Sequence, residues 1–153
     1  GLESILENGM DKQITFINDD VNNLFNYDYS EKFDVVVCNP PYFKMTRDIK
    51  ENEYYKRAMF EESMPLEDMF KCFRKFCKDN GVVYTLYPAN RFIEFYQMAI
   101  QYKMKFMSLR FVYDKKKKFA LRFIVKMKIG PMKDINILKP VYIDAGDVIF
   151  DED

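Results

Sequence analysis

The sequence predicts a mixed α/β fold, in which a mostly parallel sheet is closed by an antiparallel hairpin. Three observations lead to this prediction. Short runs of β-branched and aromatic residues alternate with segments whose apolar residues recur every three to four positions, as in strands joined by crossover helices. Two late runs, residues 106–113 and 119–129, flank a lysine-rich turn, which is typical of a hairpin. The length of 153 residues fits one domain, and 48% apolar residues suffice for a core.

The first elements expected are a helix end and a short strand. Residues 2–9 resemble the last turns of a helix, with Gly9 suited to its C-terminal cap. Residues 13–18 (QITFIN) form a β-rich run that predicts a strand. Residues 22–32 are polar and aromatic, and we expect an irregular or partly helical connection there.

A second strand ends in an abrupt, rigid turn. Residues 33–38 (FDVVVC) are continuous and β-branched, which suits a strand buried on both faces of a parallel sheet. Asn39-Pro40-Pro41-Tyr42 then stops the strand, because proline has no N–H to donate to a ladder. Cys38, the last residue of the run, is expected to be a buried thiol.

Two amphipathic helices and a third strand follow. Residues 65–79 predict a helix with Pro65 near its start, and this helix would place Cys72 and Cys77 on different faces. Residues 82–87 (VVYTLY) predict the next strand, and residues 91–102 another amphipathic helix. The C-terminal hairpin would be followed, over residues 135–150, by an extension with short strands.

The composition excludes several classes of site. The chain has no histidine, so it cannot hold a His-based triad, a histidine general base or a His-ligated metal. Three cysteines in a His-free chain predict neither a disulfide framework nor a metal site. No stretch approaches ~18 consecutive apolar residues, so no membrane span is expected. The first residues lack the pattern of a signal peptide, and we predict a cytoplasmic protein.

The turn after residues 33–38 is the strongest candidate for a functional site. Ligands of open α/β sheets bind at the carboxyl ends of the strands, where this turn lies. The Asn39 side-chain carbonyl and the Pro40 backbone carbonyl could each accept an N–H from a planar amine, which would raise its nucleophilicity without a general base. Pro40 and Pro41 would preorganise these acceptors, and Tyr42 offers a flat surface for a target ring. The alternative is a rigid turn without function.

This motif resembles that of S-adenosylmethionine-dependent amino-methyltransferases, which act on adenine N6 or on a glutamine amide. Further segments are similar to one branch, the bacterial tRNA (adenine-N6)-methyltransferases. They are Arg57 to Glu62, Leu66-Glu67-Asp68, Leu109 to Tyr113 and Ile137 to Ile143. The resemblance implies a Rossmann-like class I methyltransferase fold, S-adenosylmethionine as cofactor, and an adenine in the anticodon loop of a valine tRNA as substrate.

The resemblance also implies roles for individual residues. Asn39 and Pro40 would hold the target amine, Tyr42 would stack on the base, and Pro41 and Phe43 would line the substrate pocket. Asp20, together with Val21, matches the acidic position that contacts the cofactor adenine, and Asn39 would also border the cofactor. From the residues alone, Asp20 fits an ordinary turn or helix cap better.

A large part of the family pattern has no counterpart in this sequence. The family's cofactor site begins with a glycine-rich loop, but the five glycines here are dispersed, and the closest two are eight positions apart. We therefore expect one partial methyltransferase domain over residues 1–153. Residues 1–32 would be a remnant of the cofactor-binding half, and residues 33–153 the catalytic and substrate-binding half. The strand at 33–38 would then be an edge strand, through which the chain could form homo-oligomers.

The net charge of zero conceals a basic segment. Residues 101–128 contain a single acid, Asp114, and ten basic residues: Lys103, Lys105, Arg110, Lys115, Lys116, Lys117, Lys118, Arg122, Lys126 and Lys128. Lys115 to Lys118 could contact tRNA phosphates, and the alternative is a solvated hairpin tip. Lys44 and Arg57, near the motif in sequence, could add substrate contacts, although acids are interleaved with them.

Two other functions remain open. The first is methylation of a glutamine amide in a protein, since enzymes of release-factor type share the Asn-Pro-Pro-Tyr motif. The second is a non-catalytic fragment or RNA-binding remnant, which the dispersed glycines favour.

Overall fold

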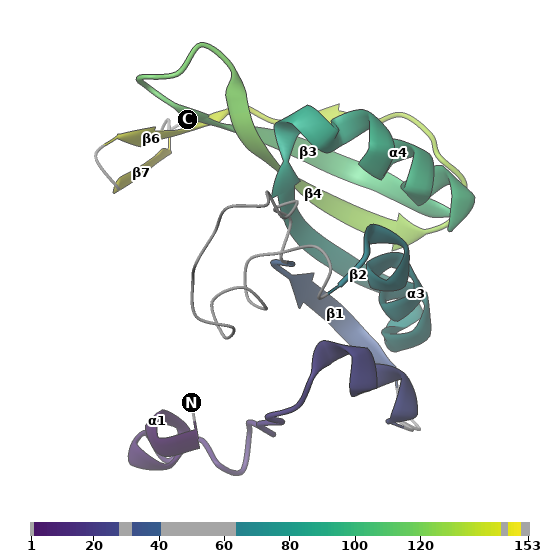
Figure 1. Cartoon of the computed structure of the whole chain (residues 1–153), viewed down its shortest axis with the longest axis vertical. Helices are drawn as coiled ribbons and strands as arrows, with labels where there is room; N and C mark the ends of the chain where they lie inside the picture. Colours follow the sequence, from purple (N-terminus) through teal and green to yellow (C-terminus); the bar gives the residue numbers. More distant parts are fainter. Residues whose placement is uncertain (1, 28–31, 41–63, 145–146, 151–153) are drawn as a thin grey trace, which may run out of the picture.

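The computed structural model describes residues 2–27, 32–40, 64–144 and 147–150. In this part of the chain, one sheet of seven strands runs in the order β1-β2-β4-β3-β6-β7, and β5 pairs with β3 (Figure 1). The strands are β1 (Phe33–Cys38), β2 (Cys77–Pro88), β3 (Met104–Asp114), β4 (Ala120–Ile129), β5 (Asn136–Ile137), β6 (Val141–Asp144) and β7 (Asp147–Phe150). The helices are α1 (Leu2–Glu7), α3 (Leu66–Phe76) and α4 (Phe92–Gln101), with 3₁₀ turns η1 (Val21–Asn26) and η3 (Ala89–Arg91).

The sheet is mixed, as predicted. β1 and β2 are parallel, and β3 and β4 form the expected antiparallel hairpin. Of the pairings between described strands, three are parallel and three antiparallel, so the expectation of a mostly parallel sheet is not met. The difference arises because β4 lies between β2 and β3 and runs against both.

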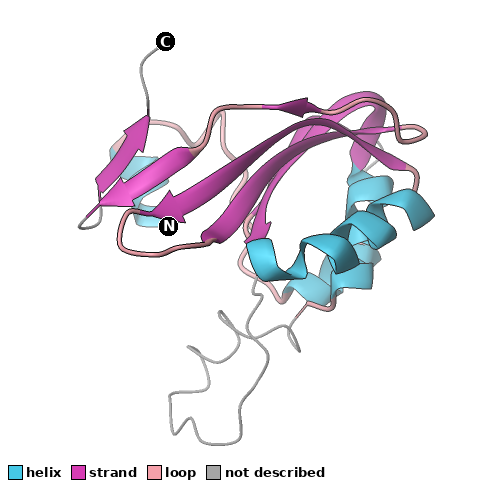
Figure 2. Ribbon diagram, turned by 90° about the horizontal axis from the view of Figure 1, so that it is seen from above, coloured by secondary structure: helices cyan, strands magenta, loops and turns pink. Residues whose placement is uncertain are grey.

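The core lies between the sheet and the helices α3 and α4, which cover the same face (Figure 2). On α3, the buried residues recur at helical spacing, and acidic residues in the first turn and basic residues in the last complement the helix dipole. From Gly81 to Tyr87, every second residue of β2 is buried against this layer, including Val83 and Tyr87. Phe70, Phe95 and Phe123 are fully buried and meet in edge-on or tilted contacts.

The N-terminal segment differs from its prediction in one element. Gly9 does cap α1, since its φ of 64° is left-handed and its N–H donates to the Leu6 carbonyl. Residues 13–18, however, form no strand. Phe16 and Ile17 there are 49% and 39% exposed. A strand is stable only when its N–H and C=O groups pair with a neighbour, and no described strand pairs with this segment.

β1 is the edge strand that the resemblance predicts, and the expectation that both its faces are buried is wrong. It pairs only with β2 among the described strands, and Val35 and Val37 are 54% and 76% exposed. Their alternation with the half-buried Val36 and Cys38 shows that one face of β1 packs on the helix layer. The apolar residues on the other face of β1, Val35 and Val37, are therefore left largely uncovered by the described part of the chain.

The boundary between α3 and β2 lies earlier than predicted. The helix ends at Phe76, and Cys77 already has extended dihedral angles and pairs with Phe33. Cys72 and Cys77 therefore lie on different elements, not on two faces of one helix. Between the Phe33–Cys77 and Val35–Val82 pairs the register shifts, so that residues 78–81 form a bulge in β2.

Candidate functional site

The carboxyl ends of three strands lie at one edge of the sheet. β1 and β2 are parallel, and because β4 is antiparallel to both β2 and β3, β3 runs in the same direction as β1. Asn39 and Pro40 follow β1 directly at this edge, one and two residues beyond the Cys38–Thr85 pair. The turn that follows β3 projects from the same edge (Figure 1). The topology thus gathers the motif and the lysine turn on one side of the molecule.

The two described residues of the motif differ in burial. Asn39 is exposed, whereas Pro40 is buried. Within the described residues, no hydrogen bond holds the Asn39 amide. The buried proline fixes the backbone that carries the Pro40 carbonyl. The Asn39 side chain, in contrast, faces solvent. This arrangement suits an acceptor group that is to receive N–H bonds from a ligand.

Directly before the motif, Cys38 anchors the strand end in the core. Burial, and secondarily the nearby Cys72 thiol, raises the pKa of Cys38 to about 12. Cys38 therefore stays a neutral thiol and is not a nucleophile at physiological pH. Its pairing partner Thr85 is 2% exposed, and the Thr85 hydroxyl has no hydrogen-bond partner among the described residues.

A rigid aromatic and charged cluster, which the sequence analysis did not identify, follows β2 at the same edge. The Arg91 guanidinium lies 5.2 Å from the Tyr87 ring centroid. It also donates two hydrogen bonds to Glu94, of 2.6 and 2.8 Å. These contacts fix the turn from β2 into α4. In the sequence, Pro88-Ala89-Asn90, between the strand predicted over 82–87 and the helix predicted over 91–102, is a break that marks this turn.

Five of the predicted substrate contacts lie outside the described residues. These are Pro41, Tyr42, Phe43, Lys44 and Arg57. Their assignments remain predictions.

Asp20 and Val21, the predicted cofactor contacts, lie at the start of η1. Asp20 precedes η1, and the carbonyl of Phe25, in η1, accepts a 2.6 Å hydrogen bond from Lys75 in the last turn of α3. That end of α3 adjoins the amino end of β2, opposite the edge that carries Asn39. The predicted cofactor contacts of Asp20 and Val21 stay predictions.

The Asp19 carboxylate organises the segment before η1. Its carboxylate accepts 2.7 Å hydrogen bonds from the Tyr27 hydroxyl, the Asn23 amide and the Asp20 backbone N–H. These bonds lower the pKa of Asp19, that from Tyr27 contributing most. Asp19 thus has a turn and capping role of the kind weighed for Asp20, whose own carbonyl accepts a hydrogen bond from the Asn23 N–H.

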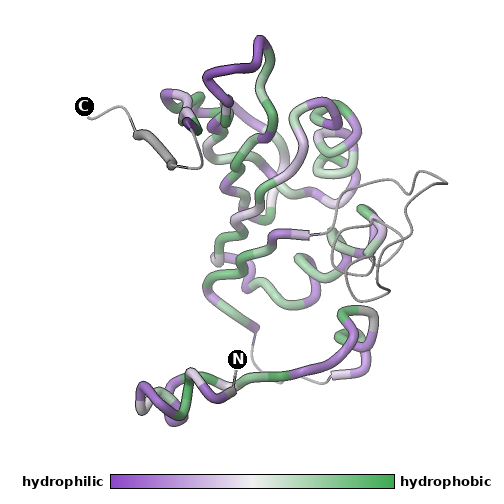
Figure 3. The backbone as a smooth tube through the Cα atoms, turned by 60° about the vertical axis from the view of Figure 1, so that its left-hand side comes forward, coloured by the Kyte–Doolittle hydropathy of each residue, from purple (hydrophilic) through white to green (hydrophobic). Residues whose placement is uncertain are grey.

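The lysine turn is an ordered structure. The Asp114 carboxylate accepts a 2.8 Å hydrogen bond from the Lys116 backbone N–H, and its carbonyl accepts one from Lys117. Lys115 is joined to β6 through its N–H, which donates to Ile143, and through an ion pair of 3.3 Å with Asp144. Lys116 to Lys118 are exposed. Figure 3 shows the turn as a hydrophilic tip of the molecule.

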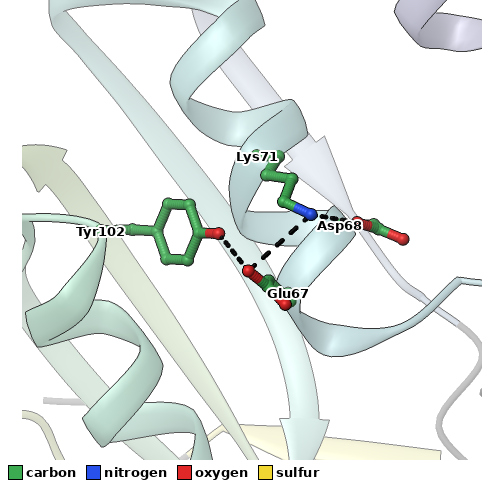
Figure 4. A network of polar contacts seen from close by, with 4 residues as sticks. All are labelled: Glu67, Asp68, Lys71 and Tyr102. Carbon is green, nitrogen blue, oxygen red and sulfur yellow. Dashed lines mark hydrogen bonds and ion pairs between the residues drawn. The ribbon is translucent and has the colours of Figure 1, made fainter.

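The Leu66-Glu67-Asp68 segment, part of the family pattern, has a structural role. Leu66 is buried, and Glu67 accepts a 2.8 Å hydrogen bond from the Tyr102 hydroxyl at the end of α4 (Figure 4). Lys71 lies 2.8 Å from Asp68 and 3.8 Å from Glu67, and the bond to Asp68 raises the pKa of Lys71. These contacts join α3 to α4 on the surface.

Metal-ligand groups and membrane-spanning helices are both absent from the described residues. No cluster of cysteine, aspartate and glutamate there could hold a metal ion. None of the described helices is long and apolar enough to cross a membrane.

Comparison with known proteins gives three findings. The family described as Eco57I restriction-modification methylase matches residues 2–118. A curated tRNA1(Val) (adenine(37)-N6)-methyltransferase of Aliivibrio salmonicida is 21% identical over 130 residues, which are 85% of this chain and 54% of that protein. A crystal structure of a predicted O-methyltransferase from Agrobacterium tumefaciens superposes with a TM-score of 0.50 at 14% identity, over 75% of this chain and 45% of that one. The chain thus spans about half the length of these relatives.

Proposed function

We propose that this chain, which belongs to the Eco57I restriction-modification methylase family, is the amine-holding and substrate-binding half of an S-adenosylmethionine-dependent adenine-N6 methyltransferase that acts on tRNA. The observation that carries the proposal is the position of Asn39 and Pro40 directly after β1, at the carboxyl edge of the sheet. The Rossmann-like fold, shared with the structure of a predicted O-methyltransferase, is consistent with it. The similarity to a tRNA adenine-N6 methyltransferase supports the choice of substrate.

The chemistry needed from these residues is that of two fixed acceptors. The Asn39 side-chain carbonyl and the Pro40 backbone carbonyl would each accept one N–H of the adenine amine. Two such bonds draw the nitrogen lone pair away from the ring and aim it at the methyl donor. Because the acceptors are neutral, this step needs no group that titrates near pH 7, in agreement with the absence of histidine.

The described residues do not form a complete cofactor site. S-adenosylmethionine would supply the methyl group as an electrophilic sulfonium methyl. The sequence offers no glycine-rich loop for its methionine portion. We therefore expect this chain by itself to bind S-adenosylmethionine poorly. Isothermal titration calorimetry that gives micromolar affinity for the monomeric chain would contradict this expectation.

Transfer of a labelled methyl group to tRNA by the full-length protein tests the function. Replacing Asn39 by alanine removes one preorganised acceptor, and we expect kcat to fall about 10²–10³-fold. Asn90→Ala is the matched control, since Asn90 is also exposed and follows β2 at the same edge. We expect it to retain full activity. Equal activity of the Asn39→Ala variant and the unmodified protein would refute the role of Asn39.

The substrate is tested by presenting competing acceptors to the same protein. tRNA should be methylated in preference to duplex DNA, which the restriction-modification description of the family makes the second candidate. A peptide-chain release factor tests the amide-methyltransferase alternative. Absence of transfer to all three would favour the non-catalytic alternative.

A further inference from the structure

The turn between β3 and β4 presents an aromatic ring that the fold does not use. Phe119 is 81% exposed, the highest exposed fraction among the large apolar residues of the described chain. Burying a phenylalanine side chain is worth roughly 1.5–3 kcal/mol, and turns favour glycine, asparagine, aspartate and proline. Neither packing nor turn chemistry accounts for a phenylalanine at this position.

The surroundings of the ring are basic. Lys116, Lys117 and Lys118 directly precede it and are exposed, and no described carboxylate forms an ion pair with them. The two nearby acids, Asp114 of the turn and Asp144 of β6, have other partners. Asp114 accepts the backbone hydrogen bonds that shape the turn, and Asp144 pairs with Lys115. An exposed ring next to cations suits a strand that has phosphates and unstacked bases.

The register of the sheet gives the distance between this turn and Asn39. Cys38 is level with Thr85, Val125 and Leu109 across the four strands. Three interstrand spacings separate β1 from β3, which is roughly 14 Å. Asp114 lies five residues beyond Leu109, so the hairpin overhangs the site by roughly 17 Å. The turn is therefore on the order of 20 Å from Asn39, too far to touch the target base but within reach of other nucleotides of the same substrate.

We propose that Phe119 stacks on an unpaired base of the RNA substrate outside the target position, while Lys116 to Lys118 contact the neighbouring phosphates. The inference rests on the proposed function, because it assumes a nucleic-acid substrate. It deepens that function, since it requires the substrate to be a folded RNA with single-stranded nucleotides at a distance from the methylated adenine. A free nucleoside would not reach the turn.

Binding of a stem-loop RNA to the full-length protein, measured by fluorescence anisotropy, tests the proposal. Phe119→Ala should weaken binding roughly 5–150-fold, the range for loss of one stacked base, with an unchanged salt dependence. Replacing Lys116, Lys117 and Lys118 by glutamine should instead reduce the slope of log K against log salt by roughly 2, at about 0.7 per phosphate contact. Unchanged affinity of Phe119→Ala would overturn the proposal.

A tryptophan reporter separates stacking from charge attraction. The chain contains no tryptophan, so Phe119→Trp gives a unique fluorophore in it. We expect stem-loop RNA to quench this fluorophore, and a fully paired duplex of equal length or a polyphosphate to leave it unchanged. Ile100→Trp is the control, because Ile100 is 51% exposed near the end of α4, close to the start of β3 and therefore far from the turn that follows β3. Quenching by polyphosphate, or blue-shifted emission before RNA is added, would overturn the proposal, since the ring would then respond to charge or be covered by protein.

The outcomes also distinguish this inference from the proposed function. If Phe119→Ala weakens RNA binding while Asn39→Ala leaves methyl transfer intact, the turn binds RNA but the catalytic proposal fails. If Asn39→Ala abolishes transfer while Phe119→Ala binds RNA normally, the catalytic proposal stands and the stacking role is refuted.

Discussion

Gly81 allows β2 to lie close to β1, the strand that precedes the candidate site. Replacing Gly81 by alanine should push β1 away from β2. A β-carbon at Gly81 would lie 2.9 Å from the Asp34 carbonyl, 3.0 Å from the Phe33 carbonyl and 2.8 Å from the Cys77 sulfur. Carbonyl oxygens of a paired strand cannot rotate away, so β1 itself would have to move. Overpacking of this kind costs typically 1–3 kcal/mol. At roughly 2–4 °C per kcal/mol for a chain of this size, we expect Tm to fall by about 4–8 °C for a cost near 2 kcal/mol.

Urea denaturation and alkylation of Cys38 together test this prediction. Urea reports the global loss, and faster alkylation of Cys38 reports local opening of β1, since Cys38 is its last residue. Gly9→Asn is the control, because nothing lies within 4 Å of a β-carbon there and asparagine tolerates a φ of 64°. Adding Cys77→Ala should restore little of the stability, since two of the three close contacts are backbone atoms. A Gly81→Ala variant with unchanged stability and unchanged Cys38 reactivity would refute the assigned packing of β1 on β2.

Three further predictions concern cysteine reactivity, pH dependence and self-association. Because the pKa of Cys38 is about 12 and that of an ordinary cysteine 9.0, its alkylation near pH 8 should be roughly a thousandfold slower than that of an exposed thiol, as mass spectrometry would show. Partial desolvation and the hydrogen bond to Glu67 raise the pKa of Tyr102 above its ordinary value of 10.0. The neutral phenol therefore stabilises the fold fully below pH 10.0, and this contribution is lost as the pH rises through the raised pKa. Thermal melts against pH should show this alkaline loss in the unmodified protein and lack it in Tyr102→Phe. Val37→Lys should reduce self-association of this chain in sedimentation velocity, because a lysine beside an open strand edge opposes pairing with a second copy. Equal sedimentation of both proteins would count against association through β1.

Local sequence patterns predicted the elements whose formation depends on residues that are close together in sequence. The apolar spacing of α3, the β-branched run of β1 and the lysine turn between β3 and β4 each specify an element through neighbours in sequence. Residues 13–18 have the same β-rich character but form no strand, because strand formation depends on a partner that sequence periodicity does not reveal. The end of α3 was misplaced for a similar reason. Cys77 leaves the helical pattern only because it pairs with Phe33, more than forty residues earlier.

The candidate site could be predicted in part. Asn39 and Pro40 follow a recognisable strand, so the rule that ligands bind at strand carboxyl ends located them. The cluster of Tyr87, Arg91 and Glu94 could not be found, because its members meet through the turn from β2 into α4. Phe119 was overlooked for a different reason. In the sequence, Phe119 begins an ordinary β-rich run. Only the structure shows that it precedes β4 and that its ring is 81% exposed.

The position of β4 explains how one chain can present both the turn proposed to hold the target amine and a distant arm proposed to bind RNA. If β3 were followed by another crossover, its end would return across the sheet and leave only a short loop at the edge. The antiparallel return through β4 instead lets β3 extend five residues past the level of Cys38. The arm needs no helix to support it, because Lys115 is bonded to β6 and Asp114 closes the turn. The pairing of β2 with β4 fixes the offset between the arm and Asn39. The distance between them, on the order of 20 Å, is therefore set by the register of the sheet. Selection for a folded RNA, and against a lone nucleoside, would then depend on backbone pairing as much as on the side chains that touch the substrate.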